Sequence, residues 1–317
     1  MEYITLLIGI VGILWGADRF TDGAIAVARR FQINELIIGL TIVAFGTSLP
    51  EFITSFWGAL KGNSGVSVGN IIGSNLFNTL VIVGASALAS PIMIKASSVK
   101  KEIPFALLAS LAFIFLCFDR LLNNQAIDFI SRGDGLILLL FFAIFLSYTF
   151  ASAKQDQSEE SEQDETTPLS SLKIAFYLLI GLAVLIIGGD FFVSGAIQIA
   201  QNFGVSDAVI GLTIVAGGTS LPELATSVFA AKKGSSDLAI GNVVGSNIFN
   251  IFFVMGACSS VFPLAVGDIS YLDFAMLIIS MLLLWLFAAT GRKISRSEGA
   301  ILLATYFIYL AYLLITL

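Results

Sequence analysis

Two glutamates lie within apolar stretches of this chain, and each is preceded by the same four residues, Thr-Ser-Leu-Pro. They are Glu51, in the stretch 35–60, and Glu223, in the stretch 207–231. An ionised side chain in such surroundings typically costs on the order of 3 kcal/mol. Neither stretch contains a lysine or arginine near its glutamate. A cation that arrives and leaves is therefore a better partner than a permanent ion pair.

Further oxygen ligands surround each glutamate. Proline has no N–H and its ring clashes with the carbonyl four residues back, so Pro50 and Pro222 should free backbone carbonyls where nearby glycines let the helix break. In an apolar medium, free carbonyls are tolerated where they line a cavity. A plain helix kink is the alternative. The adjoining hydroxyls are those of Thr47, Ser48, Thr219 and Ser220.

A second block of polar residues follows each glutamate. It contains Ser74 and Asn78 in one case and Ser246 and Asn250 in the other. Residues four apart share one face of a helix, so these side chains could also face the cation; helix packing is the alternative. We expect the neighbouring Asn75 and Asn247 to point off that face and to be structural.

The ligand set is entirely oxygen, because the chain has no histidine and its two cysteines lie in apolar runs. Oxygen ligands favour hard cations such as Ca²⁺, Na⁺ or Mg²⁺. Mg²⁺ requires rigid octahedral geometry, so a flexible cage of broken helices suits Ca²⁺ and Na⁺ better. Two carboxylates balance one Ca²⁺ or two Na⁺, which is what exchange at one site requires.

The composition places these groups in a membrane. Of 317 residues, 57% are hydrophobic and 12% are charged, about half the charged fraction of an average globular chain. A soluble enzyme and a disordered protein are both excluded. The net charge of −6 argues against nucleic acid as a partner.

A bilayer core requires about 20 apolar residues per helix, and the chain contains ten such runs. The sequence thus predicts an all-α integral membrane protein with transmembrane helices near 3–28, 35–60, 66–89, 103–122, 133–153, 172–200, 207–231, 237–260, 271–290 and 298–317.

The two halves of the chain are copies of each other. Residues 39–51 and 211–223 are identical at twelve of thirteen positions, and residues 69–78 and 241–250 follow at the same offset of 172. Asp18 and Asp190 also keep this offset. For these two aspartates we expect a local polar contact near a helix end, with a gating or ion-entrance role as the alternative.

Because each copy has five spans, an odd number, the second must enter the membrane upside down. This is the inverted-topology repeat of many secondary transporters, which bind their substrate near the midplane. We expect a first five-helix repeat at 1–153, an acidic linker at 154–171 and a second five-helix repeat at 172–317, with the repeated motifs at 39–78 and 211–250.

Basic residues indicate the orientation, since cytoplasmic loops carry an excess of Lys and Arg. With an outside N-terminus, twelve basic residues fall in inside loops and three, Lys61, Arg120 and Arg132, in outside loops. Both termini should therefore lie outside and the acidic linker in the cytoplasm. The short loops suggest a prokaryotic plasma (inner) membrane.

The repeated Gly-Thr-Ser-Leu-Pro-Glu and Gly-Ser-Asn-x-Phe-Asn blocks resemble the two α-repeats of the sodium/calcium exchanger family, within the calcium:cation antiporter superfamily. The resemblance covers nearly the whole chain. It implies that Glu51 and Glu223 are shared central ligands and that the first and sixth spans slide past the rest in alternating access. The remaining implied ligands are Thr47, Ser48, Ser74, Asn78, Thr219, Ser220, Ser246 and the carbonyls of Ala44 and Ala216.

One residue departs from the pattern of the family. Many members end the second motif with Asp, whereas this chain has Asn250, so the core has one titratable group fewer. This puts the ion stoichiometry and any K⁺ co-transport in doubt. The linker is also too short for the calcium-sensing domains of animal members.

We therefore expect a Na⁺/Ca²⁺ antiporter with no cofactor, whose partners are Ca²⁺, Na⁺ and the lipid bilayer; nothing in the sequence requires a protein partner. A Ca²⁺/H⁺ antiporter is the alternative, because buried carboxylates can also carry protons. An uncoupled cation channel with the same oxygen lining is a further alternative. An enzyme is not expected, since metalloprotease chemistry of the His-Glu-x-x-His type requires histidine and no nucleophile–base pair is apparent.

Overall fold

The computed structural model describes residues 2–122, 124–156, 169–204, 216–267 and 269–316. Of the six acidic residues of the linker, five lie outside these ranges, as do residues 205–215, which include the first part of the seventh expected span, and the side chains of Asp156 and Ala216. The fold is helical, as expected, with only four two-residue strands in the described ranges.

The first half contains one long helix, a set of broken helices and a final long helix. Its helices, with η for π-helix, are α1 (Glu2–Phe31), α2 (Glu35–Ile38), η1 (Gly39–Val43), α3 (Ala44–Thr47), α4 (Leu49–Leu60), α5 (Ser64–Leu76), η2 (Phe77–Ile82), α6 (Val83–Ala89), α7 (Ala96–Lys100), α8 (Glu102–Leu116), α9 (Asp119–Leu122) and α10 (Arg132–Asp156).

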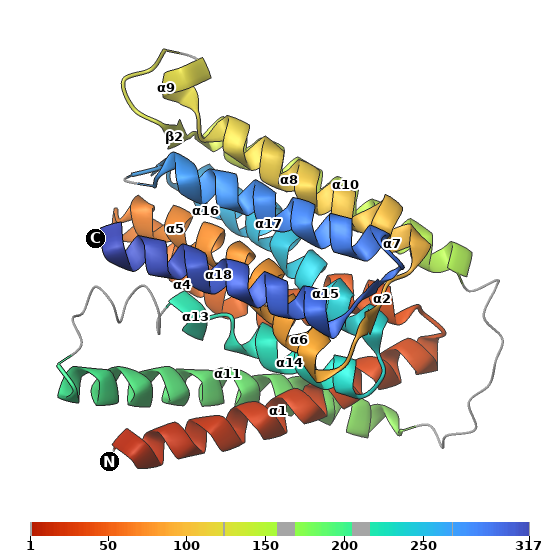
Figure 1. Ribbon diagram of the computed structural model, residues 1–317. Helices are drawn as coiled ribbons and strands as arrows, with labels where there is room; N and C mark the ends of the chain where they lie inside the picture. The colour runs from red at the N-terminus through yellow and green to blue at the C-terminus, as the bar shows by residue number, and fades with distance from the viewer. Residues whose placement is uncertain (1, 123, 157–168, 205–215, 268, 317) are drawn as a thin grey trace.

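The described part of the second half follows a similar order, without counterparts of α7 and α9. Its helices are α11 (Ser171–Asn202), α13 (Ala216–Gly218), α14 (Leu221–Lys232), α15 (Ser236–Ile248), η4 (Phe249–Met255), α16 (Gly256–Val261), α17 (Tyr271–Ala289) and α18 (Arg296–Thr316). Helix α1 begins and α18 ends at one end of the molecule, whereas α10 ends and α11 begins at the other (Figure 1).

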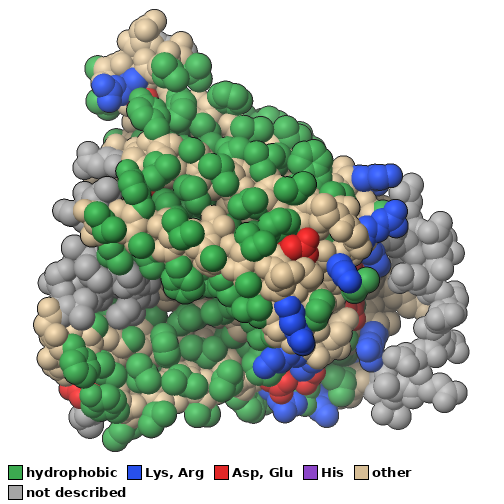
Figure 2. Space-filling model, viewed as in Figure 1, with side chains coloured by type: hydrophobic (Ala, Val, Ile, Leu, Met, Phe, Trp, Pro, Cys, Tyr) green, Lys and Arg blue, Asp and Glu red, His purple; other side chains and the backbone are tan. Residues whose placement is uncertain are grey.

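Seven described helices are long and apolar enough to cross a membrane, or eight if the bent pair Glu35–Thr47 and Leu49–Leu60 is one span. The fourth expected span, 103–122, ends early: α8 stops at Leu116 and has 15 residues, about 22 Å. The seventh expected span is only partly described. Hydrophobic side chains cover most of the face shown in Figure 2, and Lys and Arg gather mainly at one end.

The helices that contain the two repeated motifs lie at the centre of the molecule. In the most apolar part of Ser236–Val261, 94% of residues are buried, and the figure for Ser64–Ala89 is 72%. The corresponding figure is 17% for the helices at 132–153 and 296–315. The central helices are therefore shielded by protein, and the peripheral helices present apolar side chains outward, as a bilayer requires.

Two short antiparallel strand pairs connect the halves. Strand β1 (Ile92–Met93) pairs with β4 (Lys293–Ile294), with Ile92 opposite Ile294. Strand β2 (Phe129–Ile130) pairs with β3 (Leu264–Ala265), with Ile130 opposite Leu264. Each pair joins a strand of the first half to a strand of the second.

Helices α1 and α11 form a separate layer, running antiparallel beside the central helices (Figure 1). Glycines let their backbones touch, because a Cβ on Gly16 would lie 2.6 Å from the backbone nitrogen of Leu185. A Cβ on Gly188 would lie 2.7 Å from the nitrogen of Ile13. Close contact through small residues is a common way to pair helices in membranes, and here it makes α1 and α11 one unit.

Candidate functional site

The break expected before each glutamate is present. In the first half the helix bends by 46° between Thr47 and Leu49. Pro50 occupies the first turn of α4, where its missing N–H costs no hydrogen bond. In the second half Pro222 has the same place in α14. Each glutamate thus lies in the first turn of a helix, where the helix dipole favours negative charge.

The two glutamates are completely buried and are held by serines of the opposite half. Both Glu51 and Glu223 are 0% exposed. The Ser48 hydroxyl donates to Oε1 of Glu223 across 2.9 Å, and the Ser220 hydroxyl donates to Oε1 of Glu51 across 2.8 Å. Ser74 adds a longer hydrogen bond, 3.5 Å, to the same oxygen of Glu51. The site is therefore built across the interface between the halves.

The second carboxylate oxygen of each glutamate has no hydrogen-bond partner. The same is true of four further buried oxygens from the predicted set, so six predicted ligand atoms are unpaired: Glu51 Oε2, Glu223 Oε2, Asn78 Oδ1, Asn250 Oδ1, Thr219 Oγ1 and Ser246 Oγ. Buried polar groups are normally satisfied. Six unpaired oxygens on the repeated motifs, two of them carboxylate, are what an all-oxygen cation site requires.

The side-chain amides of Asn78 and Asn250 are each oriented by an asparagine of the opposite half. Asn78 Nδ2 donates to Asn247 Oδ1 across 3.2 Å, and Asn250 Nδ2 donates to Asn75 Oδ1 across 3.1 Å. Each amide nitrogen is thereby occupied and each amide oxygen is left without a partner. Asn75 and Asn247 thus have the structural role that was expected of them.

Thr47 and Ala44 already have partners. The Thr47 hydroxyl lies 3.0 Å from the Val43 carbonyl oxygen and 3.2 Å from Asn242 Oδ1. The Ala44 carbonyl accepts the N–H of Ser48 across 3.1 Å, so as an ion ligand it would use its second lone pair. Ala216 is the first residue of α13.

Sequence reasoning missed two supporting asparagines. Asn70 Nδ2 donates to the Glu51 carbonyl and to the Ser55 hydroxyl, at 3.2 and 2.9 Å. Asn242 makes the equivalent bonds to the Glu223 carbonyl and the Ser227 hydroxyl, at 3.4 and 2.9 Å. The sequence contained a sign of this contact, because Ser55 and Ser227, the partners of these asparagines, also lie 172 residues apart.

The π-helical segments were also unforeseen, and two of them have matching positions in the two halves. Segments η2 and η4 begin at Phe77 and Phe249, one residue before Asn78 and Asn250. Single π-turns within α-helices are frequent at functional sites because the wider turn changes the direction of the side chains. Their identical position in both halves connects them with the placement of the two amides.

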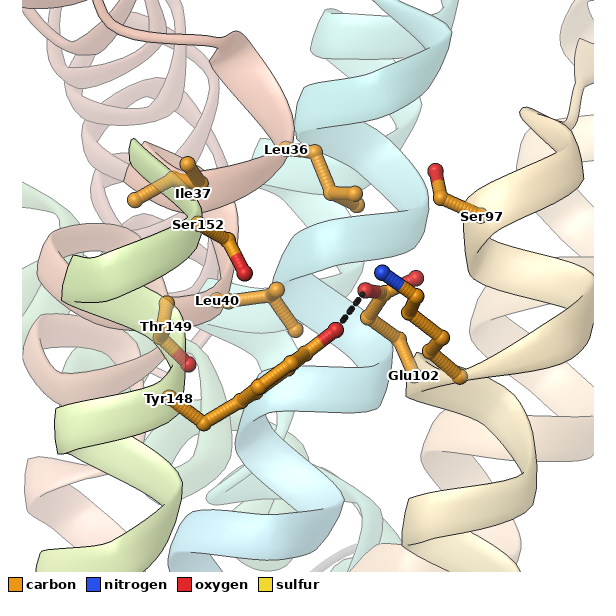
Figure 3. A pocket seen from close by; sticks show the side chains of 9 residues that line it. Leu36, Ile37, Leu40, Ser97, Glu102, Tyr148, Thr149 and Ser152 are labelled. Carbon is orange, nitrogen blue, oxygen red and sulfur yellow. Dashed lines mark hydrogen bonds between the residues drawn. The ribbon is translucent and has the colours of Figure 1, made fainter. Parts of the chain in front are cut away.

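A cavity of about 70 Å³ lies elsewhere, among α2, η1, α8 and α10. There the Tyr148 hydroxyl donates to Oε1 of Glu102 across 3.0 Å, as Figure 3 shows. Neither Glu51 nor Glu223 lines this cavity. Among the described residues, no group of three or more Asp, Glu, Cys or His side chains could hold a metal ion.

Known proteins resemble this chain over nearly its whole length. The family model described as "Sodium/calcium exchanger protein" matches residues 1–151 and 173–315. The sodium/calcium exchanger MaX1 of Methanosarcina acetivorans is 34% identical, over 99% of this chain and 98% of that protein. The putative antiporter CaxA of Alkalimonas amylolytica is 39% identical, over 96% of both.

Solved structures of a sodium-calcium exchanger have the same fold as this chain. The sodium-calcium exchanger NCX_Mj soaked with 2.5 mM Na⁺ and 0.1 mM Ca²⁺ is 36% identical in sequence and has a TM-score of 0.82, over 98% of this chain and 97% of that one. A curated membrane protein of Methanocaldococcus jannaschii, MJ0091, is 36% identical over 97% of this chain. The chain belongs to the sodium/calcium exchanger family of integral membrane antiporters.

Proposed function

We propose that this protein exchanges Ca²⁺ for Na⁺ across the membrane, at one site between the two halves near the midplane of the bilayer. The observation that carries the proposal is the pair of fully buried glutamates, one from each half, each with an unpaired carboxylate oxygen. The two negative charges balance one Ca²⁺ or two Na⁺. The names of MaX1, which is 34% identical to this chain, and of NCX_Mj, which is 36% identical and has the same fold, support exchange of these two ions.

The proposed ligands are Glu51 and Glu223 at the centre, with Asn78, Asn250, Thr219 and Ser246 contributing oxygens that have no other partner. Ser48, Ser220 and Ser74 hold the carboxylates by hydrogen bonds and have lone pairs left for an ion. Thr47 and the carbonyls of Ala44 and Ala216 complete the proposed set. No cofactor takes part, and no chemical bond of a substrate is changed.

Transport proceeds by alternating access in this proposal. Residues 1–153 and 172–317 are two inverted five-helix repeats joined by the cytoplasmic linker 154–171. The layer of α1 and α11 is the part that moves, because these helices contact each other through glycines while the ligands lie on other helices. Both termini lie outside. In support, α1 begins and α18 ends at the same end of the molecule (Figure 1).

The test is Ca²⁺ uptake by purified protein in proteoliposomes, with Na⁺, K⁺ and H⁺ gradients imposed one at a time. We expect an outward Na⁺ gradient alone to drive uptake. Uptake that ignores Na⁺ and follows a pH gradient would establish a Ca²⁺/H⁺ antiporter instead. Ca²⁺ flux that requires no counter-ion would identify a channel.

A further inference from the structure

An ion-pair cluster ties α1 to the end of α14. The Lys233 ammonium lies 2.7 Å from Asp18 Oδ1 and 2.7 Å from Asp22 Oδ1. Arg19 lies 3.2 Å from the second oxygen of Asp18. The side chains of Asp18 and Lys233 are 28% and 25% exposed. Asp18 belongs to the first half and Lys233 to the second, so this cluster joins the proposed moving layer to the end of α14, the helix that has Glu223 in its first turn.

The internal repeat contains this pair a second time. At the offset of 172, Asp18 corresponds to Asp190 on α11, and Lys233 corresponds to Lys61 after α4. The backbone around the two lysines is the same, with φ/ψ of −82°/2° at Lys61 and −79°/0° at Lys233. The glycine after each lysine has a positive φ, 74° and 81°. The two lysines thus have the same backbone conformation and the same position in their halves, directly after α4 and directly after α14.

The second pair is not formed. Within the described ranges, Asp190 and Lys61 make no ion pair, and both are exposed. Helix α1 packs along α14, whereas the equivalent helices α11 and α4 make no contact of similar extent. Asp190 lies on a helix with a strongly apolar sequence, where a carboxylate needs a partner or water.

The two halves also differ in the hydrogen bonds and burial of equivalent motif residues. Thr47 lies 3.2 Å from Asn242 Oδ1, but in the described ranges no equivalent hydrogen bond joins its repeat counterpart, Thr219, to Asn70. Asn242 is fully buried, whereas its counterpart Asn70 is only partly buried. Because the two halves have nearly identical motifs, these differences show that the halves adopt different conformations in one molecule.

We propose that Asp18–Lys233 and Asp190–Lys61 are two alternating ionic latches of the transport cycle. In an inverted repeat, exchanging the conformations of the two halves gives the opposite-facing state. Because the glycine contacts join α1 to α11, one displacement of this layer separates Asp18 from Lys233 and brings Asp190 to Lys61. The long lysine stem allows the ammonium to reach a carboxylate within the apolar region. This proposal rests on the proposed exchange by alternating access.

Charge reversal tests the latch that is open here. Asp190→Lys and Lys61→Asp should each slow Na⁺-driven Ca²⁺ uptake about three- to fivefold, the size expected for a partly exposed ion pair. The doubly reversed protein should return to within about twofold of the unmodified rate. The mismatched control, Asp190→Lys with Lys232→Asp, has the same net charge and should stay slow. If the doubly reversed protein is slowed by as much as the two single substitutions combined, Asp190 and Lys61 do not pair.

A second experiment does not depend on transport. In the variant with Asp190→Cys and Lys61→Cys, a short bismethanethiosulfonate should join the two cysteines, because the native Cys117 and Cys258 are buried. The joined protein should stop exchanging and recover when a reductant is added. If the unmodified protein exchanges but no cross-link forms in Na⁺ or in Ca²⁺, the latch is wrong. If the cross-link forms but no protein exchanges, the proposed function is wrong. Gel filtration in detergent checks the fold of every variant.

Discussion

Ser48 of the first half donates its hydroxyl to Glu223 of the second half across 2.9 Å. The reciprocal bond, from Ser220 to Glu51, measures 2.8 Å. The orientation of each carboxylate therefore depends on the opposite half. Relative motion of the halves can reorient both carboxylates together, which suits the proposed binding of two different cations at one site.

We expect Ser48→Ala or Ser220→Ala to weaken the apparent Ca²⁺ affinity at least about tenfold, because a hydrogen bond to a charged group contributes roughly 1.5 to 3 kcal/mol. The Ca²⁺ concentration for half-maximal uptake measures this. Ser110→Ala is the matched control, since the Ser110 hydroxyl bonds within its own helix. Equal affinities in the serine variants and the control would contradict a role for the bonds between the halves.

Glu51→Gln and Glu223→Gln should each reduce Ca²⁺ uptake to the level of protein-free liposomes. Glutamine keeps the shape of the side chain but removes a negative charge that a divalent ion requires. Glu102→Gln is the control, a buried carboxyl in the separate cavity of Figure 3. Near-normal exchange in either site variant, with a normal gel-filtration profile, would refute the site assignment.

Asn250→Asp should give the pH profile of exchange an additional titration or change the preference among Na⁺, Ca²⁺ and H⁺. The amide nitrogen of Asn250 donates to Asn75, and an aspartate can make that bond only in its protonated form. Uptake measured across a pH series tests this. An unchanged profile and ion preference would mean that Asn250 only packs and does not face the ion.

Gly188→Ala should destabilise the protein by roughly 1 to 3 kcal/mol, the usual cost of overpacking a close contact. The added methyl group would meet the backbone of Ile13 at 2.7 Å. The neighbouring Gly189→Ala is the matched control, because nothing lies within 4 Å of a Cβ there. Thermal unfolding in detergent compares the two variants. Equal melting temperatures would contradict the close contact of α1 and α11.

The proposed orientation can be tested by labelling. In intact cells, Lys61→Cys should react with a membrane-impermeant maleimide, and Lys232→Cys should react only after the membrane is permeabilised. The native cysteines are buried, so the unmodified protein should not react with the maleimide and serves as the control. The reverse pattern would place both termini inside.

Much of the site was predictable from the repeat. Identical motifs at a fixed offset identified both glutamates and the adjoining serines, and Pro50 marked the bend. These features depend on neighbours in the chain, through the loss of a backbone N–H and the exclusion of charge from apolar surroundings. The asparagines expected to be structural, Asn75 and Asn247, proved to support the amides of the motif.

The contacts between the halves were not predictable from spacing. Nothing within one motif indicates that Ser48 bonds to Glu223, the glutamate of the other repeat, because that depends on how the two halves pack against each other. The early end of α8 at Leu116 and the π-turns at Phe77 and Phe249 were also missed. Hydrophobicity is insensitive to one additional residue per turn, and it continues through Cys117 and Phe118 after the helix has ended.

The amide pairs between Asn78 and Asn247 and between Asn250 and Asn75 have a consequence for the origin of the molecule. Each pair takes one residue from each half, so neither half can orient its own amide by this bond. An ancestor consisting of a single half could therefore form the same pairs only by associating with a second copy of itself.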